Sequence, residues 1–460
     1  MRAARSLVQL TPTGKNSREA LVFAMHDDAV GTAEAVMRLM EADRFAEIDE
    51  LRVPVLRDQV PADEWRDPWQ ELIAMYGPVS RVGPPVSESA GPGNTMVKIR
   101  VTCERGAFAV LMAVDDAGAL QGLQFAPPEA AEPVAPWQPA SYVDPASFTE
   151  HPVTVGAEPW ATPGTLSLPN SPLPVPAVVL LAGSGPADRD ATIGRNKMMK
   201  DLAWGLASQG IAVLRFDKVT YTHRDALADV TDFTVVDEYV TPAVAAIQLL
   251  RDHPSVDPAL VFVLGHSQGG TVAPRVATAE PSAAGLVILA GATQPMHHAV
   301  VRQYRYLTAL REPGVNLDDD PTIREITRQA ALVDSLESSS ATPNHPPPLG
   351  IPVPYWLDLR GYDPVAVAAQ LGKPMLIMQG GRDYQVTVTE DLVGWQTGLA
   401  GHTDVTIRVV DADNHLFFSG SGPSEPAEYE PAQHVDEVVV TDVAQWIHQR
   451  ADPTRALPRR

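Results

Sequence analysis

The run GHSQG at residues 265–269 is the part of the chain best suited to chemistry. It directly follows the apolar run LVFVL and precedes residues typical of a helix, so we predict a turn between a strand and a helix. Such a turn holds a serine hydroxyl exposed above a sheet, and its glycines let the helix pass close to the strand. We therefore predict that Ser267 is a nucleophile. The alternative is a structural serine that caps the following helix.

A serine hydroxyl needs a base to take its proton, and the base needs a carboxylate to orient it. Among 12 histidines, His415 follows the apolar run VTIRVV, at a carboxyl end of a strand, where open α/β sheets place their sites. Asp383 follows the run PMLIMQ in the same way, and it is the predicted orienting carboxylate. Asp411 and Asp413 remain alternatives for that role. The chain order of Ser267, Asp383 and His415 is the one that a nucleophile-elbow fold requires.

The loop AGSGP at 182–186 follows the first long apolar run and is predicted to complete the site. We expect the backbone N–H groups of Ser184, Gly185 and Gln268 to form an oxyanion hole for the carbonyl oxygen of an acyl substrate. The alternative is a glycine-rich tight turn without a catalytic role. Neither a phosphate-binding glycine motif nor a strong metal-ligand spacing is present, so we predict no cofactor and no metal.

These residues require a sheet that brings the ends of several strands together. Continuous apolar strands alternate with helices in the second part of the chain, which predicts a mainly parallel sheet covered on both faces. The predicted strands are 176–183, 211–218, 260–267, 284–291, 374–381 and 405–412, and the predicted helices are 198–209, 235–252, 269–279, 387–399 and 434–449.

The chain is predicted to contain a small α+β domain followed by a larger α/β domain. Helical spacing from about Val30 and at Asp63–Met75 precedes four strand-like runs, VSRVG, TMVKIRVTC, AFAVLMAVD and LQGLQF. The insert from 295 to 371 interrupts the α/β rhythm and is interpreted as a lid, which His297 and His298 begin. The predicted segments are a tail at 1–25, the small domain at 26–127, a Pro/Ala-rich linker at 128–147, and the α/β domain at 148–453.

The composition of the 460 residues excludes several classes of protein. With 45% hydrophobic residues the chain can bury a large core. The 35 Lys+Arg against 57 Asp+Glu give a net charge of −22, which argues against nucleic acid and anionic membrane surfaces as partners. The single cysteine, Cys103, is expected to be a small strand residue. Neither a signal-peptide stretch nor a long apolar run is present, so we expect a soluble, cytoplasmic protein.

With these motifs, residues 148–450 resemble the α/β-hydrolase superfamily, and in particular serine hydrolases related to dienelactone hydrolases and acyl-CoA thioesterases. The resemblance is carried by GHSQGG, YWLDLRGYDP, MQGGRDYQVT and NHLFFSGSGPSEPAEY. It implies the same roles for Ser267, Asp383 and His415. Relatives usually have His-Gly where this chain has Ala182-Gly183. The front domain is similar to a small cystatin-like domain, and we expect it to be a lid or a dimerisation surface.

The resemblance implies a hydrolase that cleaves a small-molecule carboxylic ester or thioester in two steps, through an acyl-enzyme on Ser267. An acyltransferase or an acyl-eliminating enzyme with the same triad is the first alternative, and a non-catalytic binding protein is the second. Tyr355, Trp356 and Arg189 are candidate residues of the substrate pocket, although packing and a surface ion pair are equally open roles for them. A homodimer is a possible assembly.

Overall fold

The computed structural model divides the chain into two compact units, Met1–Ala135 and Pro136–Arg460, and each is described by itself. The predicted tail at 1–25 lies outside the described residues. The structure describes residues 29–59, 61–89, 93–133, 136–228, 230–337 and 347–451.

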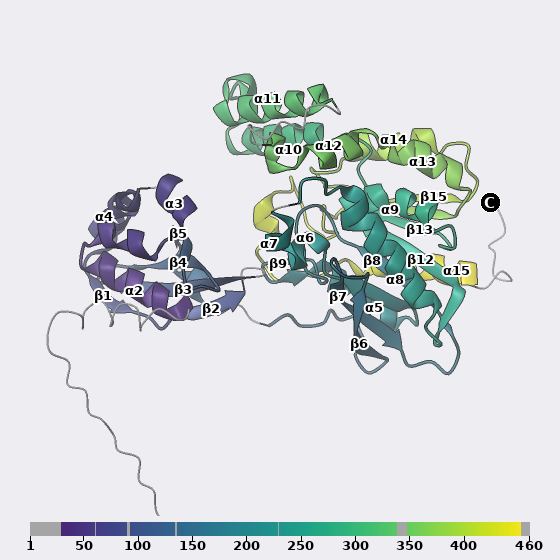
Figure 1. Cartoon of the computed structure of the whole chain (residues 1–460), viewed down its shortest axis with the longest axis horizontal. Coiled ribbons are helices and arrows are strands. Elements are labelled where there is room, and N and C mark those ends of the chain that lie inside the picture. Colours follow the sequence, from purple (N-terminus) through teal and green to yellow (C-terminus); the bar gives the residue numbers. More distant parts are fainter. Residues whose placement is uncertain are drawn as a thin grey trace, which may run out of the picture. The chain divides into compact units, whose positions relative to one another are not determined.

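The first unit packs helices against an antiparallel sheet, coloured purple to blue in Figure 1. Its sheet has five strands and not four as predicted, because VSES also forms a strand, β2 (Val86–Ser89), which pairs with β3. This strand was missed because a run with one apolar residue has no clear alternation. Cys103 is buried at the end of β3, as expected of a small strand residue. The other elements are α2 (Ala29–Glu41), η1 (Phe45–Leu51), α3 (Pro54–Gln59), η2 (Ala62–Trp65), α4 (Arg66–Tyr76), β1 (Val79–Val82), β3 (Asn94–Cys103), β4 (Ala107–Asp115), β5 (Leu120–Ala126) and η3 (Pro128–Ala131).

The second unit is built on an eight-stranded sheet in the order β15-β14-β13-β12-β8-β11-β7-β6. The six strands from β15 to β11 are parallel, and β7 and β6 add an antiparallel edge. This mainly parallel, doubly wound sheet confirms the predicted α/β-hydrolase fold class. Its strands are β6 (Phe148–Val155), β7 (Thr162–Pro169), β8 (Val175–Leu181), β11 (Ala212–Phe216), β12 (Val256–His266), β13 (Leu286–Leu289), β14 (Met375–Gly380) and β15 (Val405–Val410).

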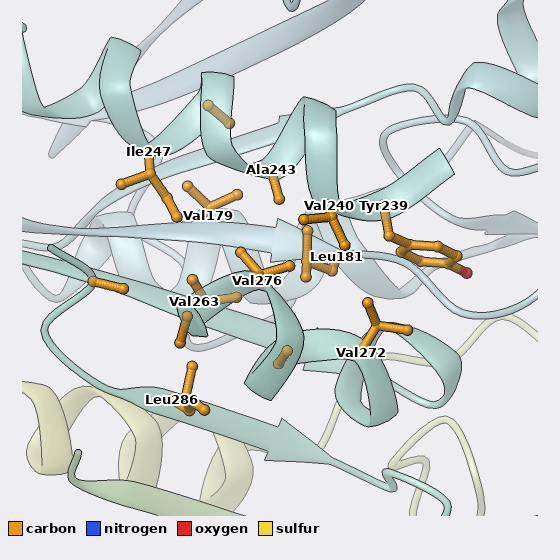
Figure 2. Close-up of a cluster of buried hydrophobic side chains, with 14 of the residues drawn as sticks. Val179, Leu181, Tyr239, Val240, Ala243, Ile247, Val263, Val272, Val276 and Leu286 are labelled. Carbon is orange, nitrogen blue, oxygen red and sulfur yellow. The ribbon is translucent and has the colours of Figure 1, made fainter. Parts of the chain in front are cut away.

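Helices cover both faces of this sheet. Successive side chains of a strand point to opposite faces, so Val179 and Leu181 of β8 join one apolar cluster while Val178 joins the other. Figure 2 shows the first cluster, in which Val179 and Leu181 meet Ala243 and other residues from neighbouring helices. This face is covered by η4 (Val236–Val240), α8 (Thr241–Arg251), α9 (Gln268–Ala279), α13 (Pro364–Leu371), η7 (Val388–Leu392) and α14 (Val393–Gly398). The opposite face of the sheet is covered by α5 (Met198–Ser208) and α15 (Glu437–Ala451).

The insert between β13 and β14 is helical and carries the green helices of Figure 1. Its elements are α10 (Met296–Arg311), η5 (Leu317–Asp319), α11 (Pro321–Ser335), η6 (Pro348–Gly350), α12 (Val353–Arg360) and α13. Arg302 of α10 joins the insert to the sheet domain, because it donates to the fully buried Asp391 of η7 at 2.8 Å. Asp391 also accepts from the backbone N–H groups of Thr293 and Gln294, which lead into α10.

Among the described residues, no helix has both the length and the apolar composition needed to cross a membrane.

Candidate active site

Ser267 occupies a strained turn between β12 and α9. Its φ of 54° and ψ of −121° lie in a region that residues other than glycine rarely adopt, at a cost of about 1–3 kcal/mol. The turn is possible because glycines flank it: a Cβ on Gly265 would clash with the backbone of Gly269, and one on Gly269 with the carbonyl of Leu181. The hydroxyl of Ser267 therefore lies at the carboxyl edge of the sheet, in the turn between a strand and a helix that the GHSQG motif predicts.

The structure brings Ser267, His415 and Asp383 into one hydrogen-bonded line. The Oγ of Ser267 lies 3.1 Å from Nε2 of His415, and Nδ1 of His415 lies 2.7 Å from Oδ2 of Asp383. His415 and Asp383 are 4% and 6% exposed, so both are shielded from bulk water. This geometry suits a serine nucleophile whose proton passes to an oriented imidazole.

Neighbouring groups fix the carboxylate of Asp383. Its Oδ1 accepts from the backbone N–H groups of Gln385 and Val386, and its Oδ2 accepts from the side chain of Gln379 at 2.9 Å as well as from His415. These donors hold the carboxylate in the orientation that the imidazole needs. The helix at Val388 is capped by another residue, Thr387, so Asp383 is not its cap.

His266 packs against His415 with ring centroids 4.7 Å apart, and its Nε2 lies 2.8 Å from the backbone carbonyl of His415. Burial lowers the pKa of His266 to about 3. This imidazole therefore stays neutral at physiological pH, and it supports the ring of His415 without adding a positive charge beside it.

Asp413, one of the alternative acids, is fully buried, and among the described residues its carboxyl makes no hydrogen bond to His415. Neither oxygen of its carboxyl has a hydrogen-bond partner among the described residues, and burial raises its pKa to about 7. Asp411 is exposed. Asp383 is thus the carboxylate that bonds to His415.

The predicted oxyanion residues lie beside the serine. Ser184, Gly185 and Gln268 line the same cavity as Ser267, and a Cβ on Gly183 would lie 3.3 Å from the Cβ of Ser267. Gln268 is the first residue of α9, so its backbone N–H has no partner within the helix. The loop and the helix start can therefore present donors to one oxygen atom.

A buried polar network, which sequence reasoning missed, holds the oxyanion loop from beneath. The carbonyl of Gly183 accepts two hydrogen bonds, one from Nζ of Lys218 at 2.9 Å and one from the hydroxyl of Tyr239 at 2.6 Å. Lys218 is 3% exposed by side chain and pairs with Glu238, which is 4% exposed, at 3.1 Å. Burial lowers the pKa of Lys218 and raises that of Tyr239 well above its ordinary value, so the phenol remains a neutral donor.

The same network reaches Gln268 through Tyr355. The amide of Gln268 donates to the hydroxyl of Tyr355 at 2.9 Å, and that hydroxyl donates to Glu238. Gln268 and the loop of Gly183 thus share one buried support. The only signal for it in the sequence is a lysine at the carboxyl end of the apolar strand IAVLRF.

A cavity of about 640 Å³ opens at Ser267 and extends under the insert. Its wall combines apolar side chains such as Met296 and Val300 with polar ones such as Gln303 and Arg360. A cavity of this size accommodates a small organic molecule.

The three predicted pocket residues do not line this cavity, which corrects their assignment. Tyr355 is 7% exposed and belongs to the network beneath the oxyanion loop. Trp356 is 1% exposed, and its indole donates to the carbonyl of Pro348 inside the insert. Arg189 makes a two-point pair with Asp217, in which both distances are 2.9 Å. Each side chain is held by packing, hydrogen bonding or charge pairing and does not itself line the cavity.

The chain is similar to known hydrolases. A family model described as "serine aminopeptidase, S33" matches residues 194–418. Esterase EstD of Thermotoga maritima is 37% identical over 344 residues, which cover 75% of this chain and 77% of EstD.

Solved structures with lower similarity include Est1E of Butyrivibrio proteoclasticus, which is 15% identical with a TM-score of 0.43 over 65% of this chain and 98% of Est1E. A dienelactone hydrolase of Anabaena variabilis is 15% identical with a TM-score of 0.39 over 66% of this chain and 98% of that enzyme.

Proposed function

Because the chain belongs to the family of α/β-hydrolase serine hydrolases that includes esterase EstD, we propose that it hydrolyses small carboxylic esters through an acyl-enzyme on Ser267. The observation that carries this proposal is the continuous line from Ser267 through His415 to Asp383, with contacts of 3.1 and 2.7 Å. The name of EstD supports an ester as the substrate.

The proposed reaction has two steps. The Oγ of Ser267 attacks the ester carbonyl while Nε2 of His415 takes its proton, and the tetrahedral oxyanion accepts from the backbone N–H groups of Ser184, Gly185 and Gln268. The protonated imidazole then gives its proton to the leaving alcohol. A water molecule, deprotonated by the same imidazole, releases the acid and frees the serine. Each oxyanion donor of this kind contributes about 10²–10³ in rate.

We favour hydrolysis over acyl transfer and elimination because EstD is named an esterase. Polar side chains, those of Thr271, Gln294, Gln303 and Arg360, also line the cavity. A thioester can follow the same steps because only its leaving group differs.

We further propose that the insert at 295–371 is the lid of this cavity. Residues of α10, α11 and α12 contribute to the cavity wall, and Arg302 joins the base of the insert to Asp391. A cytoplasmic location, a homodimer and the role of the front domain stay predictions from the sequence.

The test is labelling with a fluorophosphonate, followed by peptide mass spectrometry, on the wild-type protein and on Ser267→Ala. A single adduct on Ser267 that is lost in the variant, together with hydrolysis of p-nitrophenyl esters, supports the proposal. Thioesters and aminoacyl anilides in the same assay separate the leaving groups. The proposal fails if the folded wild-type protein forms no adduct and hydrolyses none of these compounds.

A further inference from the structure

Three side chains of the insert converge at the joint between α10 and α11. His297 and His298 lie in the first turn of α10, and Asp334 lies in the last turn of α11. The Nε2 atoms of His297 and His298 lie 2.9 and 3.2 Å from the same carboxylate oxygen, Oδ1 of Asp334. The proposed ester hydrolysis uses none of these groups.

This set of atoms matches the ligands that zinc-class ions prefer, which are imidazole nitrogen and carboxylate oxygen. One ligand atom from each residue lies within 4.8 Å of the other two. Neighbouring ligand atoms of a tetrahedral zinc ion are about 3.3 Å apart, given bond lengths near 2.1 Å. The carboxylate of Asp334 already lies at about this spacing from both imidazoles. The half-exposed ring of His298 can rotate to close the third edge.

The site is held in place before an ion arrives. His297 is 2% exposed and packs edge-on against Trp356, with ring centroids 5.7 Å apart. Trp356 in turn is fixed by its bond to Pro348. Among the described residues, Asp334 forms ion pairs with His297 and His298, and no lysine or arginine pairs with its carboxylate there.

We propose that His297, His298 and Asp334 bind one divalent ion of the zinc, cobalt or nickel class. The ion would join the start of α10 to the end of α11. Three protein ligands leave a coordination position open, and His297 and Asp334 both line the cavity that opens at Ser267, so the ion would lie in the cavity wall. The set of two nitrogens and one carboxylate disfavours Mg²⁺ and Ca²⁺, which prefer oxygen ligands alone.

The experiment titrates Zn²⁺ into untagged full-length protein that has been stripped with a chelator, by calorimetry. We expect one equivalent per chain, and a rise of the melting temperature with excess Zn²⁺. Co²⁺ in place of Zn²⁺ should give the visible absorption bands of a low-symmetry site. His298→Ala and Asp334→Asn should each weaken Zn²⁺ binding by at least about tenfold. Their side chains are 53% and 50% exposed, so both variants are expected to fold.

The matched control is His151→Ala, which removes an exposed histidine on β6 far along the chain from the insert. This variant should bind Zn²⁺ as the wild-type protein does. The proposal is overturned if the stripped protein shows no saturable binding, or if the affinity is the same in wild type, His298→Ala and Asp334→Asn. Because binding is measured directly, the result does not depend on whether the protein hydrolyses esters.

Discussion

The hydroxyl of Tyr239 is expected to control the rate of the reaction without touching the substrate. It donates to the carbonyl of Gly183 at 2.6 Å, in the loop that carries the proposed oxyanion donors. Figure 2 shows Tyr239 at the end of an apolar cluster that includes Leu181 and Val240, with its hydroxyl extending beyond the cluster. Tyr239→Phe keeps the ring in this packing and removes the hydroxyl alone.

The size of the effect follows from the bonds that remain. Lys218 still donates to Gly183 at 2.9 Å, so the carbonyl keeps one of its two donors and the loop loosens without unfolding. A buried hydrogen bond of this kind contributes about 1–2 kcal/mol. If most of that free energy appears in the transition state, kcat falls about 5- to 30-fold. KM should change little, because the hydroxyl of Tyr239 does not line the cavity.

The assay is steady-state hydrolysis of a p-nitrophenyl ester, with the melting temperature measured in parallel. Tyr142→Phe is the matched control, because its hydroxyl also donates to a backbone carbonyl, that of Val435 at 2.9 Å. We expect similar losses of stability in the two variants and a loss of kcat in Tyr239→Phe alone. Equal kcat in both variants would refute the positioning role and leave the network a purely structural feature.

Three further predictions concern other groups of the site. Asp383→Asn should lower kcat by about 10⁴ with the fold intact, measured by ester hydrolysis and circular dichroism, because the carboxylate orients His415. Lys218→Met should destabilise the protein by about 3–5 kcal/mol in urea unfolding, because it leaves Glu238 buried and unpaired, and adding Glu238→Gln should recover part of this loss. Asp413→Asn should raise the melting temperature at pH 8 and much less at pH 5. The pKa of Asp413 in the folded protein is about 7, above its ordinary value. The free energy of unfolding therefore falls as the pH rises from about 4 to 7, because the unfolded chain loses this proton more readily. The decrease is at most about 4 kcal/mol. Asp411→Asn removes an exposed carboxylate nearby and should show no such pH dependence. The same pH dependence in this variant would contradict the assignment of the effect to Asp413.

The line of Ser267, Asp383 and His415 could be anticipated because each residue lies in the turn or loop that follows an apolar strand. In a parallel sheet the carboxyl ends of such strands meet at one edge, so position along the chain was sufficient to bring the three together. The sheet itself was predictable for the same reason, since β8 and the second half of β12 are continuous apolar runs.

The support of the oxyanion loop could not be anticipated in this way. Lys218 follows β11 and Tyr239 lies in η4, and Nζ of Lys218 donates to the hydroxyl of Tyr239 at 2.6 Å. Tyr355 joins them from the insert, 117 residues after Glu238. An aromatic residue in an insert was interpreted as part of a pocket, because the sequence does not show where its hydroxyl finds a partner.

Stability alone does not account for a buried lysine and glutamate at this place. Removing two charges from water costs several kcal/mol per ion, and well-packed apolar side chains of similar volume are often as stable or more so. Here the pair holds a backbone carbonyl, that of Gly183, which an apolar side chain cannot bond. The loop of Gly183 is fixed by Lys218 and Tyr239, so the orientation of the proposed oxyanion donors is expected to depend on a charge pair that does not line the cavity.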